Sequence, residues 1–199
     1  MKIIEKSYKW SGGLAARNST EYIILHHRAG DGDADSIHRS HIENGWSGIG
    51  YHFYVRKDGS IYRGRPQETV GAHCIGHNID SVGVCFEGNW QTERNMPAAQ
   101  LKAGRELVGY LRRIYPGAQV VRHGKFFATA CPGQFFPFDE LKSGGDGMER
   151  ELTSANDLTW ELAQRIEIND VAAFVAALEK AKLEESPLYW GIYKIVNKG

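Results

Sequence analysis

The chain has 199 residues, enough for one full domain and a small second one. Its 42% hydrophobic and 24% charged residues are typical of soluble globular proteins, which excludes disordered and low-complexity classes. The 24 Lys and Arg residues balance the 24 Asp and Glu residues, so no overall charge attracts nucleic acid or an anionic membrane. Because neither a membrane-spanning segment nor a signal peptide is recognisable, we expect no membrane insertion and a chain that first stays in the cytoplasm.

The first half of the chain predicts strands and one helix. Residues 21–26 form an apolar run typical of a strand buried on both faces. A weakly amphipathic helix is predicted over residues 35–44. Residues 50–55 and 60–63 flank an Asp-Gly turn, which predicts a β-hairpin.

Two strands and a longer helix are predicted next. Residues 81–86 and 118–122 resemble buried strands. Between them, Pro97 opens a helix whose apolar residues recur every three or four positions up to Tyr115. These elements predict an α/β fold with a mixed central sheet of about five or six strands flanked by helices.

The composition changes after residue 142. Residues 143–147 combine Ser, Gly and Asp, which is typical of a flexible linker. We therefore expect a first domain over residues 1–142 and a small C-terminal helical domain over residues 146–199. Two helices, at 156–166 and 171–182, are predicted in the second domain.

Three residues can supply metal-ligand chemistry. His123 follows a predicted strand and Cys131 closes the next loop, and neutral imidazole and thiolate both suit zinc. A catalytic zinc site takes three protein ligands and leaves a fourth position for water. His26, at the end of the first buried strand, is the natural third ligand because strand ends hold side chains rigidly. On spacing alone, a core thiol beside a surface imidazole is the more common interpretation of such a pair.

Several motifs occur in the order found in one enzyme family. They cover residues 26–30, 45–53, 71–73, 122–123 and 129–133. These motifs resemble those of the zinc-dependent N-acetylmuramoyl-L-alanine amidases of type 2, a group that includes phage lysozyme-type amidases and peptidoglycan recognition proteins. The resemblance implies the fold of that family, Zn²⁺ as cofactor, and bacterial peptidoglycan as partner. It implies hydrolysis of the amide between N-acetylmuramic acid and L-alanine.

The resemblance also implies roles for individual residues. His26, His123 and Cys131 fall on the family's three zinc ligands. Tyr51 falls on the catalytic tyrosine, and Thr129 falls on a position that helps to stabilise the oxyanion. Because recognition proteins without activity typically lack the cysteine, its presence here favours an enzyme.

Five further residues bear on the base and on the substrate. Glu87, at a strand end, is an alternative general base, although a strand-end glutamate is usually solvated. His73 and Asn78 are candidate groove residues, or they satisfy the backbone of a turn. Arg65 is a candidate partner for carboxylates of the stem peptide. Lys125 stands where many relatives carry an acidic residue, which bears on substrate preference more than on metal binding.

Three more residues are expected to be structural. His27 should point away from His26, because neighbouring side chains alternate along a strand. Cys74 and Cys85 are expected to remain free thiols in a reducing compartment.

The sequence therefore predicts a cell-wall lytic amidase, similar to a phage or prophage endolysin and released from the cytoplasm to the wall. A non-catalytic peptidoglycan-binding module and an intracellular amidase that recycles muropeptides are the alternatives. For residues 146–199 we expect wall targeting, with homodimer formation as the competing role.

Overall fold

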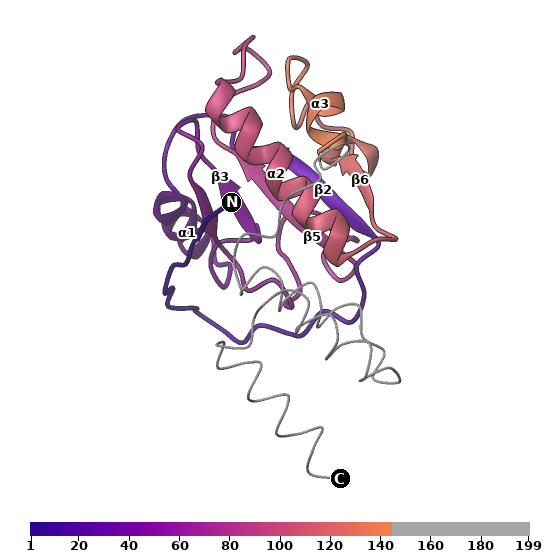
Figure 1. Cartoon of the computed structure of the whole chain (residues 1–199). Helices are drawn as coiled ribbons and strands as arrows, with labels where there is room; N and C mark the ends of the chain where they lie inside the picture. Colours follow the sequence, from indigo (N-terminus) through magenta and orange to yellow (C-terminus); the bar gives the residue numbers. More distant parts are fainter. Residues whose placement is uncertain (145–199) are drawn as a thin grey trace, which may run out of the picture. The chain divides into compact units, whose positions relative to one another are not determined.

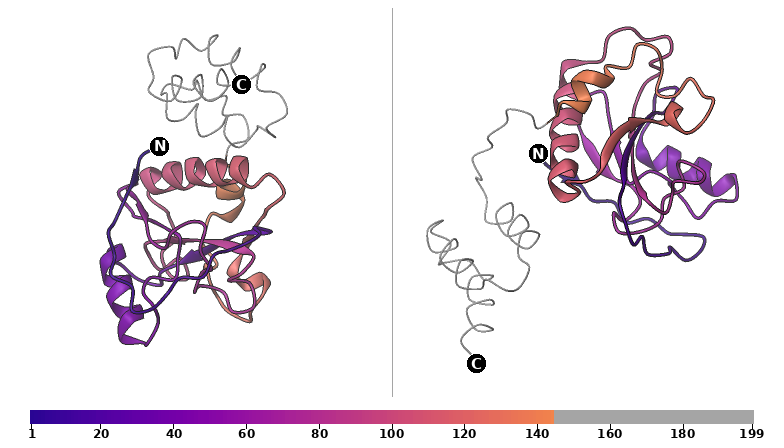
Figure 2. Two further views of the ribbon diagram at one scale, coloured as in Figure 1. Left: turned by 90° about the horizontal axis from the view of Figure 1, so that it is seen from below. Right: turned by 90° about the vertical axis from the view of Figure 1, so that its right-hand side faces the viewer.

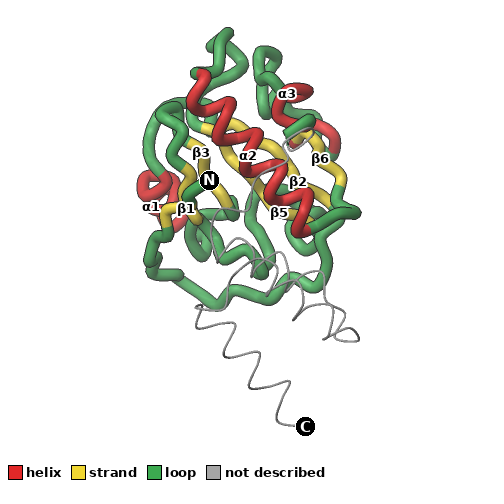
Figure 3. The backbone as a smooth tube through the Cα atoms, viewed as in Figure 1, coloured by secondary structure: helices red, strands yellow, loops and turns green. Residues whose placement is uncertain are grey.

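The computed structural model describes residues 1–144. Residues 143 and 144 of the predicted linker are therefore described, whereas the rest of the linker and the predicted helical domain lie outside the described part. Figure 1 and Figure 3 show these elements: β1 (Ile3–Ile4), β2 (Tyr22–His27), α1 (Ala34–Glu43), β3 (Phe53–Val55), β4 (Ile61–Arg63), β5 (Ser81–Phe86), α2 (Ala98–Ile114), β6 (Gln119–Arg122), the 3₁₀ turn η1 (His123–Lys125) and α3 (Phe138–Lys142). The sequence did not predict β1, η1 and α3, which are too short to show a periodicity. Within residues 1–144, no helix has the length and apolar character needed to cross a membrane.

Six strands form one mixed sheet in the order β1-β4-β3-β5-β2-β6. Only the β3–β4 pair is antiparallel, and the other neighbours are parallel. This confirms the predicted mixed sheet and its hairpin. The central strands β2 and β5 are covered on both faces, which explains their continuous apolar sequences.

Helices cover both faces of the sheet. Figure 2 shows α2 and α3 on one face and α1 on the other. Along β2, Ile23 and Leu25 join the core beneath α2, whereas Ile24 packs with Cys74 on the opposite side. By the same alternation, His26 belongs to the face away from α2.

The sheet order brings the two predicted histidine ligands together. Strands β2 and β6 are parallel neighbours, and Leu25 pairs with Arg122. His26 and His123 each follow this pair by one residue, so they lie side by side at the carboxyl edge of the sheet. Ligand sites in sheets of parallel strands form at this edge.

The loop after β6 carries the predicted thiol ligand. The carbonyl of Cys131 accepts a hydrogen bond from the Gly124 amide at 3.1 Å. Gly133 has a φ of 108° and lies against the backbone of Trp90, where a Cβ atom would overlap the chain. These contacts hold the Cys131 loop against the strand ends.

Candidate active site

His26, His123 and Cys131 form a cluster at the carboxyl edge of the sheet. Their ligand atoms all lie within 4.8 Å of one another, and Nδ1 of His26 is 3.8 Å from Sγ of Cys131. Zinc bound tetrahedrally by nitrogen and sulfur needs ligand atoms roughly 3–4 Å apart. The donor set and its spacing therefore fit a zinc ion, with three protein ligands and one position left open.

Burial controls the protonation of these ligands. His26 is 1% exposed, and burial lowers the pKa of His26 well below its ordinary value. Burial also lowers the pKa of His123 and raises the pKa of Cys131 to about 11. The two imidazoles are thus neutral and ready to bind a cation, whereas the thiol loses its proton when a metal binds.

His73 lies behind the first ligand. Its Nδ1 atom is 3.0 Å from Nε2 of His26, and the ring is 9% exposed. The sequence named His73 as a candidate groove residue, but not as a partner of His26. That contact joins β2 to the loop before β5, and no short-range pattern records it.

The two predicted catalytic side chains occupy different surroundings. The ring centroid of Tyr51 lies 5.2 Å from that of His26, and burial raises the pKa of Tyr51 well above its ordinary value. The phenol therefore stays protonated and can donate a hydrogen bond. Thr129 is exposed, and its hydroxyl accepts a hydrogen bond from the Cys131 amide at 3.2 Å.

Glu87 lies in a different environment from the one the sequence predicted. The side chain is 4% exposed, so the expectation of a solvated strand-end glutamate is wrong. Its carboxylate accepts hydrogen bonds from the Gly32 and Lys57 amides and from the guanidinium of Arg56. These donors occupy both oxygens, and Glu87 does not belong to the metal-ligand cluster.

Two candidate substrate residues, Arg65 and Asn78, form hydrogen bonds with backbone groups of the protein itself. Arg65 is 5% exposed, and its guanidinium donates to the carbonyls of Ile49 and Val70. Asn78 Oδ1 accepts from the amides of His73 and Cys74. This geometry favours a structural role for Arg65 and turn stabilisation by Asn78.

The structure agrees with the expectations for the three residues taken as structural, His27, Cys74 and Cys85. The Trp90 amide donates to Nδ1 of His27 at 3.2 Å, within the core beneath α2. Cys74 and Cys85 carry free thiols. His27 therefore points away from the ligand cluster, as predicted.

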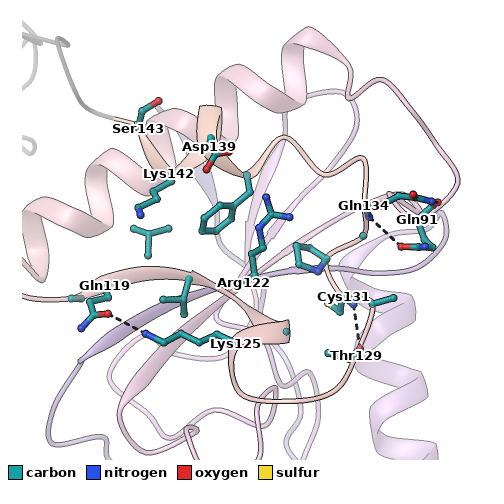
Figure 4. A pocket seen from close by; sticks show the side chains of 18 of the residues that line it. Gln91, Gln119, Arg122, Lys125, Thr129, Cys131, Gln134, Asp139, Lys142 and Ser143 are labelled. Carbon is teal, nitrogen blue, oxygen red and sulfur yellow. Dashed lines mark hydrogen bonds between the residues drawn. The ribbon is translucent and has the colours of Figure 1, made fainter.

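A cavity of about 1070 Å³ adjoins Cys131 and Thr129 (Figure 4). It extends from these residues past β6 to α3. Its charged lining residues are mostly basic: Arg112, Arg122, Lys125 and Lys142, against one acidic residue, Asp139. Of these charged residues, the sequence analysis related only Lys125 to substrate preference. The other charged residues were missed because the cavity is assembled from segments that are distant along the chain.

Comparison with known proteins gives a consistent result. The pattern of the N-acetylmuramoyl-L-alanine amidase family matches residues 16–134. The endolysin of Klebsiella phage KP32 is 38% identical over 124 residues, which cover 58% of this chain and 82% of the relative.

Solved structures agree with this similarity. The N-acetylmuramoyl-L-alanine amidase LysC from Clostridium intestinale URNW is 40% identical with a TM-score of 0.69, over 72% of this chain and 96% of that protein. Peptidoglycan recognition protein-LE, solved with tracheal cytotoxin, a monomeric diaminopimelic acid-type peptidoglycan, is 27% identical with a TM-score of 0.61. That match covers 71% of this chain and 92% of the recognition protein.

Proposed function

The chain belongs to the N-acetylmuramoyl-L-alanine amidase family, and from this premise we propose how its residues cut the cell wall. The enzyme hydrolyses the amide between N-acetylmuramic acid and L-alanine of peptidoglycan, as a lytic enzyme of the endolysin kind. The cluster of two imidazoles and one thiol at the carboxyl edge of the sheet carries the proposed mechanism.

In this proposal His26, His123 and Cys131 hold zinc. When bound, zinc would lower the pKa of a water molecule to about 7 and would polarise the carbonyl of the scissile amide. The neutral imidazoles offer lone pairs without first losing a proton, since burial keeps the pKa of both rings low. The sheet holds both histidine ligands in place, because His26 lies within β2 and His123 directly follows β6.

Tyr51 and Thr129 are proposed to act on the reacting amide. The protonated phenol of Tyr51 can donate to the oxygen that gains negative charge at the scissile carbon. The hydroxyl of Thr129 can add a second donor, since its proton is not used when the oxygen accepts from Cys131 N. Removing one such donor typically costs about 10²–10³ in rate.

The wall polymer is proposed to extend into the cavity beside Cys131. Peptidoglycan is much larger than the scissile amide, so it needs space on the side of the metal cluster that the cavity provides. The excess of basic lining residues favours a carboxylate-bearing part of the polymer there. Lys125 belongs to this lining, which connects its departure from many relatives with substrate preference.

Product analysis tests the proposed function directly. Purified peptidoglycan is incubated with the full chain, with and without a chelator, and the released products are identified by mass spectrometry. We expect peptides with a free N-terminal alanine, and we expect their release to stop with the chelator. Release that is unaffected by complete metal removal would overturn the zinc mechanism.

A Cys131→Ala variant separates an enzyme from a binding module. We expect the variant to pellet with peptidoglycan but to lose at least about 10²-fold in amidase rate, because one of three ligands is missing. The matched control is Cys74→Ala, which removes a free thiol outside the ligand cluster. Retained lysis by Cys131→Ala would contradict zinc hydrolysis, and a wild-type chain that binds without cutting would support the recognition-module alternative that the similarity to recognition proteins raises.

A further inference from the structure

We propose that His73 is a positioning residue that fixes the tautomer of His26 through a hydrogen-bond relay ending at the backbone carbonyl of His77. The relay runs from His26 through His73 and Ser81 to that carbonyl. The inference deepens the proposed function and rests on it in one respect, namely that His26 binds zinc.

Counting protons along the relay gives its direction. A backbone carbonyl only accepts, so the Ser81 hydroxyl donates its one proton to the carbonyl of His77. The Ser81 oxygen is then the acceptor for Nε2–H of His73, at 3.4 Å. A neutral imidazole carries one N–H, so Nδ1 of His73 is an acceptor.

The same count determines the state of the metal ligand. Nδ1 of His73 accepts from Nε2–H of His26 at 3.0 Å. The lone pair of His26 is therefore on Nδ1, the atom that lies 3.8 Å from Sγ of Cys131. A metal-binding histidine needs its lone pair on the nitrogen that faces the ion, and its other N–H bond holds the ring in place.

The packing around His73 leaves its ring one position. Gly71 and Gly83 lie on the ring so closely that a Cβ atom at either residue would overlap it. Asn78 Oδ1 accepts from the His73 amide at 2.8 Å and fixes the backbone of the same residue. This arrangement accounts for a buried histidine and an asparagine that the mechanism does not otherwise use.

The test compares two variants of the relay with a matched control. His73→Phe removes the acceptor but keeps a planar ring, whereas His73→Asn places an amide oxygen near the position of Nδ1. The control is His38→Phe, since His38 is also 9% exposed and lies in α1, outside the relay. Zinc affinity is measured by competition with a chelator, and the absorption spectrum of the Co²⁺-substituted protein reports the ligand set.

We expect His73→Phe to weaken zinc binding about 10–100-fold and to change the Co²⁺ spectrum. His73→Asn should recover most of the affinity, and His38→Phe should bind zinc as the wild type does. Wild-type zinc affinity in a folded His73→Phe would overturn the proposal. Equal losses in His73→Phe and His73→Asn would also overturn it, because packing and not the acceptor would then be responsible.

A metal-free measurement keeps this test separate from the proposed function. Long-range ¹H–¹⁵N NMR of the wild-type chain with a chelator distinguishes the two histidine tautomers. We expect the proton on Nε2 in both His26 and His73, whether or not the protein binds zinc. A proton on Nδ1 of His26 would overturn the relay even if the amidase activity were confirmed, and the measurement applies even if the His73 variants do not fold.

Discussion

A carboxylate that already accepts several hydrogen bonds has little capacity left for a substrate proton, and Glu87 is such a group. Two backbone amides and the guanidinium of Arg56 donate to its oxygens. The side chain thereby ties the end of β5 to the loops at residues 32 and 57. Glu87 is therefore expected to contribute to stability and not to proton transfer.

Glu87→Gln tests this expectation. The amide group cannot accept on its nitrogen side, so we expect the free energy of unfolding to fall by about 2–3 kcal/mol, as for lost hydrogen bonds to a charged group. The amidase rate per folded molecule should stay within a few-fold of the wild type. Glu43→Gln, an exposed change at the end of α1, is the control in urea unfolding and activity assays. A rate loss of about 10²–10⁴ at unchanged stability would indicate that Glu87 is the base after all.

The sequence indicates ligand residues better than it indicates the partners of buried polar groups. His26, His123 and Cys131 were named because imidazole and thiolate suit zinc and because the three residues fall on the ligand positions of the family that the motifs resemble. The backbone partners of Arg65 and Glu87 are 5 to 55 residues away along the chain, and Glu87 also accepts from the side chain of Arg56, 31 residues away. Only the fold brings such groups together, so both residues were assigned to solvent or substrate.

His52 lies beside His73, with ring centroids 5.6 Å apart, and it joins two segments of the backbone. Its Nε2–H donates to the carbonyl of Thr69 at 2.9 Å, and its Nδ1 accepts from the Gly83 amide at 3.0 Å. Burial lowers the pKa of His52 to about 3, from an ordinary value of 6.5. Below pH 6.5 the unfolded chain therefore takes up a proton that the folded protein excludes.

This difference predicts that the free energy of unfolding decreases as the pH is lowered. The contribution of His52 is complete above pH 6.5 and decreases toward pH 3 by at most about 1.4 kcal/mol per pH unit. His52→Gln, which keeps a donor for Thr69, should make the fall in urea midpoint between pH 6.5 and 4.5 shallower. All samples contain a chelator, so metal release does not add to the slope. An unchanged slope would show that His52 is protonated in the folded protein.

The sequence predicted the helices and strands whose hydrophobic periodicity is strong, but it did not predict the residues at which they begin and end. The hairpin was expected from residue 50, but β3 begins at Phe53. Gly50 accepts from the amide of Ala72, and Tyr51 accepts from that of Arg65, so these residues pair with loops before the strand starts. Long-range pairing of this kind has no signal in the local sequence.

For the whole molecule, the fold class could be predicted but the cavity could not. Alternating strands and helices with apolar runs indicate a sheet covered on both faces. The sheet order, with β6 at one edge, depends on pairings between distant strands. The cavity lies along that edge and takes its basic side chains from β6, η1, α2 and α3.

Residues 1–144 and the rest of the chain are expected to have different tasks. The ligand cluster, Tyr51 and Thr129 all lie in the described part, whose buried core includes residues from β2, β5 and α2. The family pattern also ends at residue 134. We therefore expect a chain truncated after residue 145 to fold and to cut small soluble muropeptides at a rate within a few-fold of the full chain.

Binding to intact walls should respond differently. If residues 146–199 target the wall, the truncated chain should pellet with purified sacculi less than the full chain does, and its rate on sacculi should fall with binding. Cys131→Ala in the full chain is the control, because it retains residues 146–199 and lacks a metal ligand. Oligomeric mass is measured on the same samples by light scattering. Unchanged pelleting together with the loss of a dimer would assign residues 146–199 to self-association, and the wall-binding surface would then have to lie within the amidase domain itself.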